Sequence, residues 1–425
     1  MSDTSHQNHS HDGLARRTAD AARRRVEALF GRHGPAFRQL AVGWSTHVAG
    51  DTLVAIGLAG TLFFSVPSGE ARGNVALYLA LTLAPFAVIA PVLGGIFTRF
   101  PGVYRAAMVL AALFRAVIAV AMAFTLDSTL ILYPLAFGML VFSRLYGIGK
   151  ASMLPVALPA PVALVGANAL LARIGIYAGA LVVPLGALAA RIDPSVALLL
   201  SAGFFAFCAF ASLGLPDPRG GPPSPEDGLR PIEHPDATAF RGRSLRLSRL
   251  ATAGVRLING FLLFMLAFEF RDADAGVFDF GALIAAGGAG YGIASLVSPW
   301  LERHLREEPM VVGALAVEAA AAFTAGQFFG LPAAAALSAS AGLAWGTAKF
   351  AFDGLLQSRV EPARRGTAFT RSETLFQLAW VVGAIIPVTI DMPAEVGLAM
   401  AGVAALAAQT LFVAGLLVER DVKDL

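Results

Sequence analysis

Long apolar runs, separated by short charged breaks, constrain this chain more than any other feature of its sequence. A helix needs about 20 apolar residues to cross a bilayer, and from Phe37 onward twelve runs reach that length. Only 14% of the residues are charged, against about 25% in soluble domains, which excludes a cytosolic enzyme. We therefore predict an all-α membrane protein with twelve transmembrane helices. The expected spans are residues 38–66, 74–98, 103–126, 128–154, 162–190, 194–215, 249–270, 276–301, 309–328, 331–357, 367–391 and 394–418.

One long polar break, rich in Pro, Gly and Arg, divides the runs into two groups of six. The predicted organisation is a polar and basic N-terminal tail (1–36), a six-helix bundle (37–215), a cytoplasmic linker (216–248), a second six-helix bundle (249–418) and a C-terminal tail (419–425). Landmarks repeat between the groups at an offset of about 203 residues, as in Asn168 and Arg371 or Pro184 and Pro387. A duplicated bundle of this kind is typical of alternating-access transporters, whose substrate site lies near mid-membrane between the halves.

Basic residues gather in every second break. With the N-terminus inside, the inner segments carry clusters such as residues 23–25 and 364–365, whereas the outer breaks carry only Arg72, Arg191 and Arg271. An excess of Lys and Arg marks the cytoplasmic side of membrane proteins. We therefore expect an integral protein of the cytoplasmic (plasma) membrane with both termini and the linker in the cytoplasm.

The break after the second run reads Gly94-Gly95-Ile96-Phe97-Thr98-Arg99-Phe100-Pro101-Gly102. It resembles the Gly-x-x-x-Asp-Arg-x-Gly motif of the major facilitator superfamily, with Thr98 where the family has Asp. The second group of runs keeps an acid at the equivalent place, as Glu302-Arg303. The resemblance covers residues 37–418. It implies two six-helix bundles, alternating access, and a structural or gating role for Gly94, Thr98, Arg99, Glu302 and Arg303.

Two further stretches, residues 164–187 and 365–383, resemble the drug and siderophore exporter branch of that superfamily. The fifth-helix motif of the branch carries a Gly-Pro pair, and here the pair is Val183-Pro184. The branch resemblance implies efflux by an antiporter. Pro184 and Pro387, which interrupt apolar runs at equivalent places, are expected to permit bending.

Ionisable residues inside the runs are the functional candidates, because a charge in hydrocarbon is unfavourable by at least a few kcal/mol. His47 and Asp51 lie four residues apart on one helical face, and Asp51 is near mid-depth. They are candidates for proton coupling or cation recognition. The alternative is an Asp held by a buried arginine, for which Arg144 is the natural guess. Glu318, in the ninth run, is the second carboxylate candidate, with a structural partner as its alternative.

The first six runs carry several cations and few acids, so spare cations are available to an anionic substrate group. Arg173 has a gating or structural alternative, and Glu373 has an alternative pairing with Arg371. Lys349 and Asp353, spaced i, i+4, predict an intrahelical salt bridge. The substrate-cavity candidates are Arg115, Arg144, Tyr146, Arg173, Tyr177, Arg256, Asn259, Glu373, Gln377 and Trp380.

The sequence therefore predicts a secondary active transporter that exports a small organic, amphipathic molecule coupled to protons. A lipid or lysolipid flippase on the same fold is one alternative, and a non-transporting membrane receptor or assembly partner is another. Neither a Walker motif nor a nucleophile with its base is present in the sequence, so we expect no enzyme, no cofactor and no metal site. The expected partners of this monomer are a small-molecule substrate, protons and the lipid bilayer, with no nucleic acid.

Overall fold

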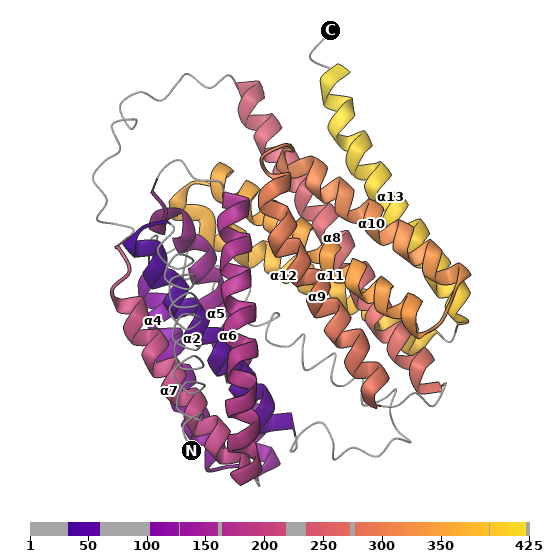
Figure 1. The fold of residues 1–425 in the computed structure, drawn as a ribbon. Helices are drawn as coiled ribbons and strands as arrows, with labels where there is room; N and C mark the ends of the chain where they lie inside the picture. Colours follow the sequence, from indigo (N-terminus) through magenta and orange to yellow (C-terminus); the bar gives the residue numbers. More distant parts are fainter. Residues whose placement is uncertain are drawn as a thin grey trace, which may run out of the picture.

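A computed structural model describes residues 33–59, 103–126, 128–159, 164–217, 235–272, 277–390 and 392–421, which fold into eleven helices (Figure 1). The predicted span 74–98, together with Gly94, Thr98 and Arg99, lies outside these residues. Each of the other eleven predicted spans overlaps with one helix. The helices are α2 (Pro35–Ala59), α4 (Tyr104–Ala123), α5 (Thr129–Ala157), α6 (Leu164–Ile192), α7 (Pro194–Leu213), α8 (Pro235–Asp272), α9 (Val277–Leu301), α10 (Glu307–Gln327), α11 (Leu331–Arg359), α12 (Pro362–Thr389) and α13 (Ala394–Asp421).

Nine helices of the described part are long and apolar enough to cross a membrane. The two exceptions are α2 and α11, which are long enough but less apolar. Both carry charged groups in their middle turns, His47 and Asp51 on α2 and Lys349 and Asp353 on α11. The polar residues in the middle of these two helices lower their mean hydropathy.

Helix α8 begins inside the segment predicted to be a linker. The sequence predicts a linker at residues 216–248 because these residues are polar, but the chain is helical from Pro235. The linker is therefore shorter than predicted. Because no proline follows Pro235 until after Asp272, nothing interrupts the backbone hydrogen bonds of the helix. Ser244 and Ser248, four residues apart, are fully buried on one face of this extension.

Helices α2 and α4–α7, which we call the first half, contact mainly each other, and so do α8–α13, the second half. In Figure 1 the first half is indigo to magenta and the second half is mostly orange to yellow. In the second half, α11 packs on α9 and α12 packs on α8 through glycines. A Cβ at Gly342 would meet the carbonyl of Gly287, and one at Gly383 the carbonyl of Leu257. Small residues allow this close approach of helices in membranes.

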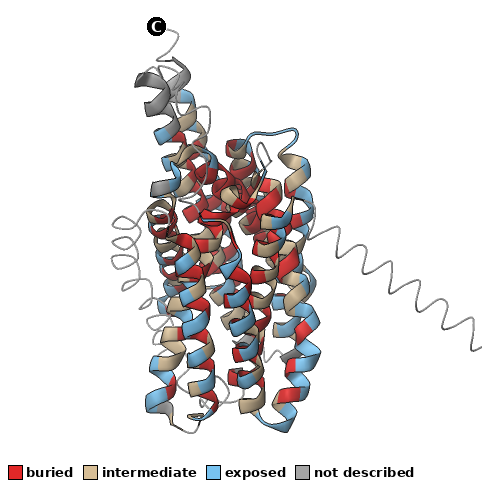
Figure 2. Ribbon diagram, turned by 90° about the vertical axis from the view of Figure 1, so that its left-hand side faces the viewer, coloured by how far each residue is buried: buried red, intermediate tan, exposed pale blue. Residues whose placement is uncertain are grey.

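The halves meet at the end of the molecule where α4, α6 and α12 begin and α9 and α11 end, which we call the closed end. Here α6 contacts α9 and α11, and α5 contacts α12. Burial follows this arrangement, because buried ribbon is densest toward the upper part of Figure 2, where the C-terminus lies, and exposed ribbon increases toward the opposite end. Among the described helices, the halves are therefore in tight contact at this end.

The glycine crossings generate a prediction on stability. Gly342→Ala should lower the free energy of unfolding by about 1–3 kcal/mol, because the added methyl forces α11 and α9 apart. Gly281→Ala, in α9, is the matched control, since a Cβ there meets nothing within 4 Å. Unfolding by SDS titration of the purified protein measures both. Equal stability of the two variants would contradict the close crossing.

Candidate functional site

A polar cavity of about 470 Å³ lies between the two halves. Helices α2, α5 and α6 line it from the first half, and α8, α9, α11 and α12 line it from the second. Most residues that the sequence singled out in these helices face it. Those on its wall are His47, Asp51, Arg144, Arg256, Lys349, Asp353, Glu373 and Gln377.

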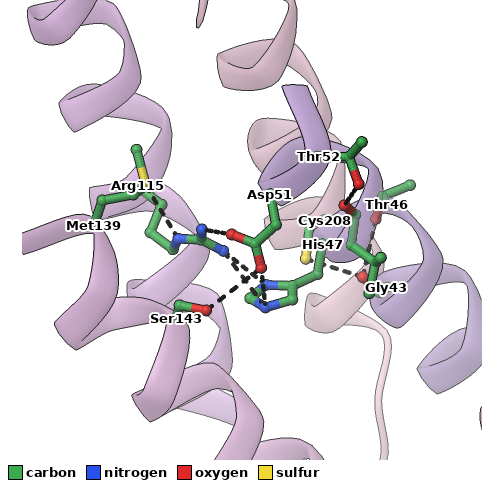
Figure 3. Close-up of polar contacts among 10 residues, drawn as sticks. Gly43, Thr46, His47, Asp51, Thr52, Arg115, Met139, Ser143 and Cys208 are labelled. Carbon is green, nitrogen blue, oxygen red and sulfur yellow. Dashed lines mark hydrogen bonds and ion pairs between the residues drawn. The ribbon is translucent and has the colours of Figure 1, made fainter. Parts of the chain in front are cut away.

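Asp51 lies at the centre of a closed network on the first-half wall (Figure 3). Arg115 Nη2 pairs with Asp51 Oδ1, while Ser143 Oγ donates to Asp51 Oδ2 at 3.4 Å. Arg115 Nη1 is 3.0 Å from His47 Nδ1, and His47 Nε2 is 3.3 Å from Asp51 Oδ2. A guanidinium can only donate, so His47 Nδ1 accepts and Nε2 carries the ring proton toward Asp51. Each of the three ionisable groups thus touches the other two.

Arg115 supports this network from behind rather than lining the cavity. Its side chain is fully buried, and its guanidinium carbon lies 4.0 Å from the ring centre of Phe205. Arg115, not the predicted Arg144, supplies the buried arginine that holds Asp51. Tyr146 is likewise buried: its ring stacks on His47 at 4.2 Å, so it positions the imidazole and does not face the cavity.

Lys349 organises the opposite wall. Its Nζ lies 2.5 Å from both carboxylate oxygens of Asp353, one turn away in α11, as the spacing predicts. The same Nζ lies 2.9 Å from Glu373 Oε1, in α12. Glu373 therefore pairs with Lys349 inside the cavity, and the alternative pairing with Arg371 is wrong. One cation joins two carboxylates across two helices.

Two other cations of the cavity rest on indole rings. Lys150 Nζ is 4.2 Å from the ring centre of Trp44. The guanidinium carbon of Arg256 is 4.6 Å from the ring of Trp345 and 5.6 Å from that of Trp380. Within the described part of the chain, neither cation lies within ion-pair distance of a carboxylate. Their charge is therefore available to a ligand.

A second cavity, the apolar pocket, has a volume of about 590 Å³ and adjoins the polar one. The two share three wall residues, Arg256, Tyr291 and Trp345. All residues that line the apolar pocket belong to α8, α9, α11 and α12 of the second half. Asn259 and Trp380, which the sequence assigned to a substrate cavity, lie here rather than in the polar cavity.

Glu318 lies outside both cavities. It is fully buried in α10, and its Oε1 accepts a hydrogen bond of 2.9 Å from Asn259 Nδ2. Its Oε2 has no hydrogen-bond partner among the described residues. Glu318 is therefore a buried carboxyl group that Asn259 separates from the apolar pocket.

Among the described residues, three polar contacts join the halves at the closed end. The sequence indicates a gating or structural role for only one of the residues involved, Glu302. Glu302 accepts hydrogen bonds from the backbone N–H groups of Val165 (3.0 Å) and Gly166 (2.7 Å) at the start of α6, where a helix favours negative charge. Burial nevertheless raises the pKa of Glu302 above its usual value, because desolvation outweighs those two donors. Arg303, next to it, is exposed.

The other two contacts are uncharged. The side-chain amide of Asn168 donates to Gln357 Oε1 at 2.6 Å, and Gln357 Nε2 donates to the carbonyl of Ala151 at 2.8 Å. Tyr104 Oη donates to the carbonyl of Pro362 at 2.6 Å and accepts from the N–H of Gly366 at 3.2 Å. The positions of Asn168, Gln357 and Tyr104 in the sequence do not indicate that they make these contacts.

The remaining candidates lie apart from the cavities. Tyr177 is 56% exposed on α6, and Arg173 lines neither cavity. Pro184 and Pro387 lie inside α6 and α12. Among the described residues no group of three His, Cys, Asp or Glu side chains is arranged to hold a metal ion.

No family model matches the chain. An uncharacterized protein of Mycobacterium leprae is 28% identical over 395 residues, covering 83% of this chain and 66% of that protein. An uncharacterized protein of Mycobacterium tuberculosis is 36% identical over 149 residues, covering 34% of this chain and 26% of that protein. The chain thus spans less than two thirds of the length of these relatives.

Solved structures of transporters share the fold. A bacterial homologue of the iron transporter ferroportin, in an outward-facing state, has a TM-score of 0.67 and 16% identity, covering 90% of this chain and 99% of its own. The Major Facilitator Superfamily transporter FucP, in the outward conformation, has a TM-score of 0.61 and 13% identity over 88% and 97%. The human organic anion transporter TETRAN has a TM-score of 0.64 and 16% identity over 90% and 98%. The chain is an integral membrane protein with the fold of major facilitator superfamily transporters.

The Asp51 network generates an asymmetric prediction. Asp51→Ala strands a fully buried cation and should lower the free energy of unfolding by about 3–5 kcal/mol. Arg115→Met should lower it less, because the Asp51 side chain is 38% exposed toward the cavity and can be hydrated. The double variant should be more stable than Asp51→Ala alone. SDS titration of the four proteins as a double-mutant cycle tests this, and equal, additive losses would contradict it.

Proposed function

We propose that this protein is a secondary active transporter that works by alternating access in the cytoplasmic membrane and carries a small organic anion out of the cell in exchange for protons. One observation carries the proposal: a charged cavity is lined by both halves of a transporter fold and sealed at one end. In this proposal the chain has twelve membrane-spanning helices, arranged as two six-helix bundles.

The proposed orientation places the closed end in the cytoplasm, because the basic breaks of the sequence lie at that end. The polar cavity then communicates with the outside, and the arrangement corresponds to an outward-facing state. To face inward, the halves must separate at the closed end. The contacts that break are those of Glu302 with α6, of Asn168 with Gln357, and of Tyr104 with the start of α12.

We propose an anionic substrate because two cations of the cavity, Lys150 and Arg256, make no ion pair with the described residues. Asp51 is neutralised by Arg115, and Lys349 is shared by Asp353 and Glu373, so the carboxylates of the cavity are occupied. Lys150 and Arg256 remain, each on an indole face. The proteins that share the fold include a homologue of an iron transporter and an organic anion transporter, so the fold does not indicate the substrate. The side chains of the cavity favour an anion over a metal ion.

We assign proton coupling to the Asp51 network because, in this conformation, the network cannot take up a further proton without losing one of its contacts. A proton on His47 Nδ1 would displace the Arg115 donor that faces it at 3.0 Å. A proton on Asp51 would remove the counter-charge of a fully buried arginine. Arg115 on α4, Arg144 on α5 and His47 on α2 are the charged or titratable groups around that carboxyl. Protonation therefore favours a different packing of α2 against α4, which biases the conformational equilibrium.

Asp51→Asn should uncouple transport, because the amide oxygen still accepts from Arg115 but the side chain no longer takes up a proton. The melting temperature of the variant shows whether it remains folded without the counter-charge of Arg115. In proteoliposomes, a pH gradient should no longer drive accumulation of a transported organic anion, whereas counterflow exchange of that anion should continue. Proton-driven accumulation at the native rate would contradict the assignment. With the native protein, flux of fluorescent lipids in place of anions would favour the flippase, and the absence of any flux would favour the receptor.

Arg256→Gln should weaken binding of small organic anions by about 10- to 100-fold, the effect of losing a hydrogen bond to a charged group in a shielded site. Arg303→Gln removes the same charge from an exposed position at the closed end and should bind as the native protein does. Thermal-shift titration with a panel of carboxylates and sulfonates measures both variants. Native-like affinity of Arg256→Gln would show that the anion does not use this residue.

A further inference from the structure

The apolar pocket has a charged entrance and an uncharged body. Arg256, Tyr291 and Trp345 form the wall it shares with the polar cavity. Beyond them the wall is formed mainly by aliphatic and aromatic side chains of the second half, with the amide of Asn259 and the hydroxyl of Ser338 as its polar groups. The apolar residues are Leu262, Leu263, Leu266, Ala267, Phe280, Leu283, Ile284, Leu337, Ala341 and Trp380. The two cavities together therefore present cations at one side and hydrocarbon at the other.

Two glycines of α9, Gly287 and Gly288, line the apolar pocket. A Cβ at Gly287 would make an ordinary contact of 3.6 Å with the carbonyl of Ser338. A Cβ at Gly288 would meet nothing within 4 Å, and Gly288 is exposed. The pocket wall at Gly288 therefore has room for a larger side chain, and no contact with a neighbouring helix requires glycine there.

We infer that the apolar pocket is the subsite for the hydrocarbon part of the transported anion, whose charged group binds at Arg256 in the polar cavity. The substrate class is then an amphipathic organic anion, with the head group and the apolar body in adjoining cavities. This inference rests on the transport function proposed above. The pocket joins the charged cavity at Arg256. This favours an amphipathic anion as the occupant, because a wholly apolar molecule would leave Arg256 without an anionic partner.

The test compares anions of increasing chain length with the native full-length protein in nanodiscs. The probes are butanoate, hexanoate and octanoate, with octan-1-ol as the uncharged control, and empty nanodiscs correct for partition into lipid. Burial of each added methylene should raise the affinity about fourfold, as expected for transfer from water to an apolar site. Octan-1-ol should bind more weakly than octanoate, because it offers no charge to Arg256.

Gly288→Phe should fill the pocket and abolish the gain with chain length, while butanoate binds as before. Gly281→Phe is the matched control, since it makes the same change on the same helix, in open space and at a position that does not line the pocket. Ile284→Trp is a second blocking variant at a position that is 70% exposed, so it tolerates a larger side chain. Melting temperatures of the three variants establish that each is folded.

The possible outcomes separate this inference from the proposed function. An undiminished gain with chain length in Gly288→Phe and Ile284→Trp, or an equal loss in Gly281→Phe, overturns the subsite. A native protein that binds all three carboxylates with equal affinity overturns the subsite but leaves anion transport standing. A native protein that binds no carboxylate at all overturns the proposed substrate class itself. Octan-1-ol binding as tightly as octanoate overturns the role of Arg256.

Discussion

The contact of Arg115 with Asp51 and His47 is the interaction on which the first half depends. A guanidinium buried in hydrocarbon is unfavourable unless it is paired and hydrogen-bonded. The structure satisfies this condition by bringing α2 against α4, with the ring of Phe205 from α7 over the guanidinium. The same contact fixes His47 and Asp51 at the cavity wall. A structural requirement of the membrane interior thereby places two titratable groups at the wall of the polar cavity.

Charge in the two halves is balanced in different ways, and the difference gives the cavity its chemistry. The first half neutralises Asp51 from behind with a cation that does not face the cavity, so that carboxylate adds little negative potential to it. In the second half one lysine, Lys349, is shared by two carboxylates, Asp353 and Glu373, so this cluster of the cavity carries one excess negative charge. Among the described residues of the cavity wall, Lys150 and Arg256 make no ion pair and lie on indole faces. Cation–π contacts stabilise such cations without occupying the ionic interactions that an anion would make.

The sequence predicts the helices well because apolar length is a local property. It also predicts the pairing of Lys349 with Asp353, since both lie on one helix one turn apart. It does not predict that Arg115 replaces Arg144 as the partner of Asp51, because this depends on which face of α4 packs on α2. The amide contact of Asn168 with Gln357 joins residues 189 positions apart, and the apolar pocket exists only through the packing of four helices. Contacts between helices leave no periodic signal in either helix.

Polar contacts are only part of what holds the closed end together. Among the described residues they are a partly exposed carboxylate on a helix N-terminus, one amide pair and one phenol. A hydrogen bond contributes about 0.5–1.5 kcal/mol net, so these polar contacts together contribute only a few kcal/mol. Apolar packing adds to them, because Phe352 and Phe369 of the second half are buried in one cluster with Leu154 and Leu170 of the first half. In the function proposed above, moving one elementary charge through a potential of 100 mV supplies about 2.3 kcal/mol. This energy is similar to that of the polar contacts, so uptake of one proton at the Asp51 network would bias the closed end without having to match its whole stability.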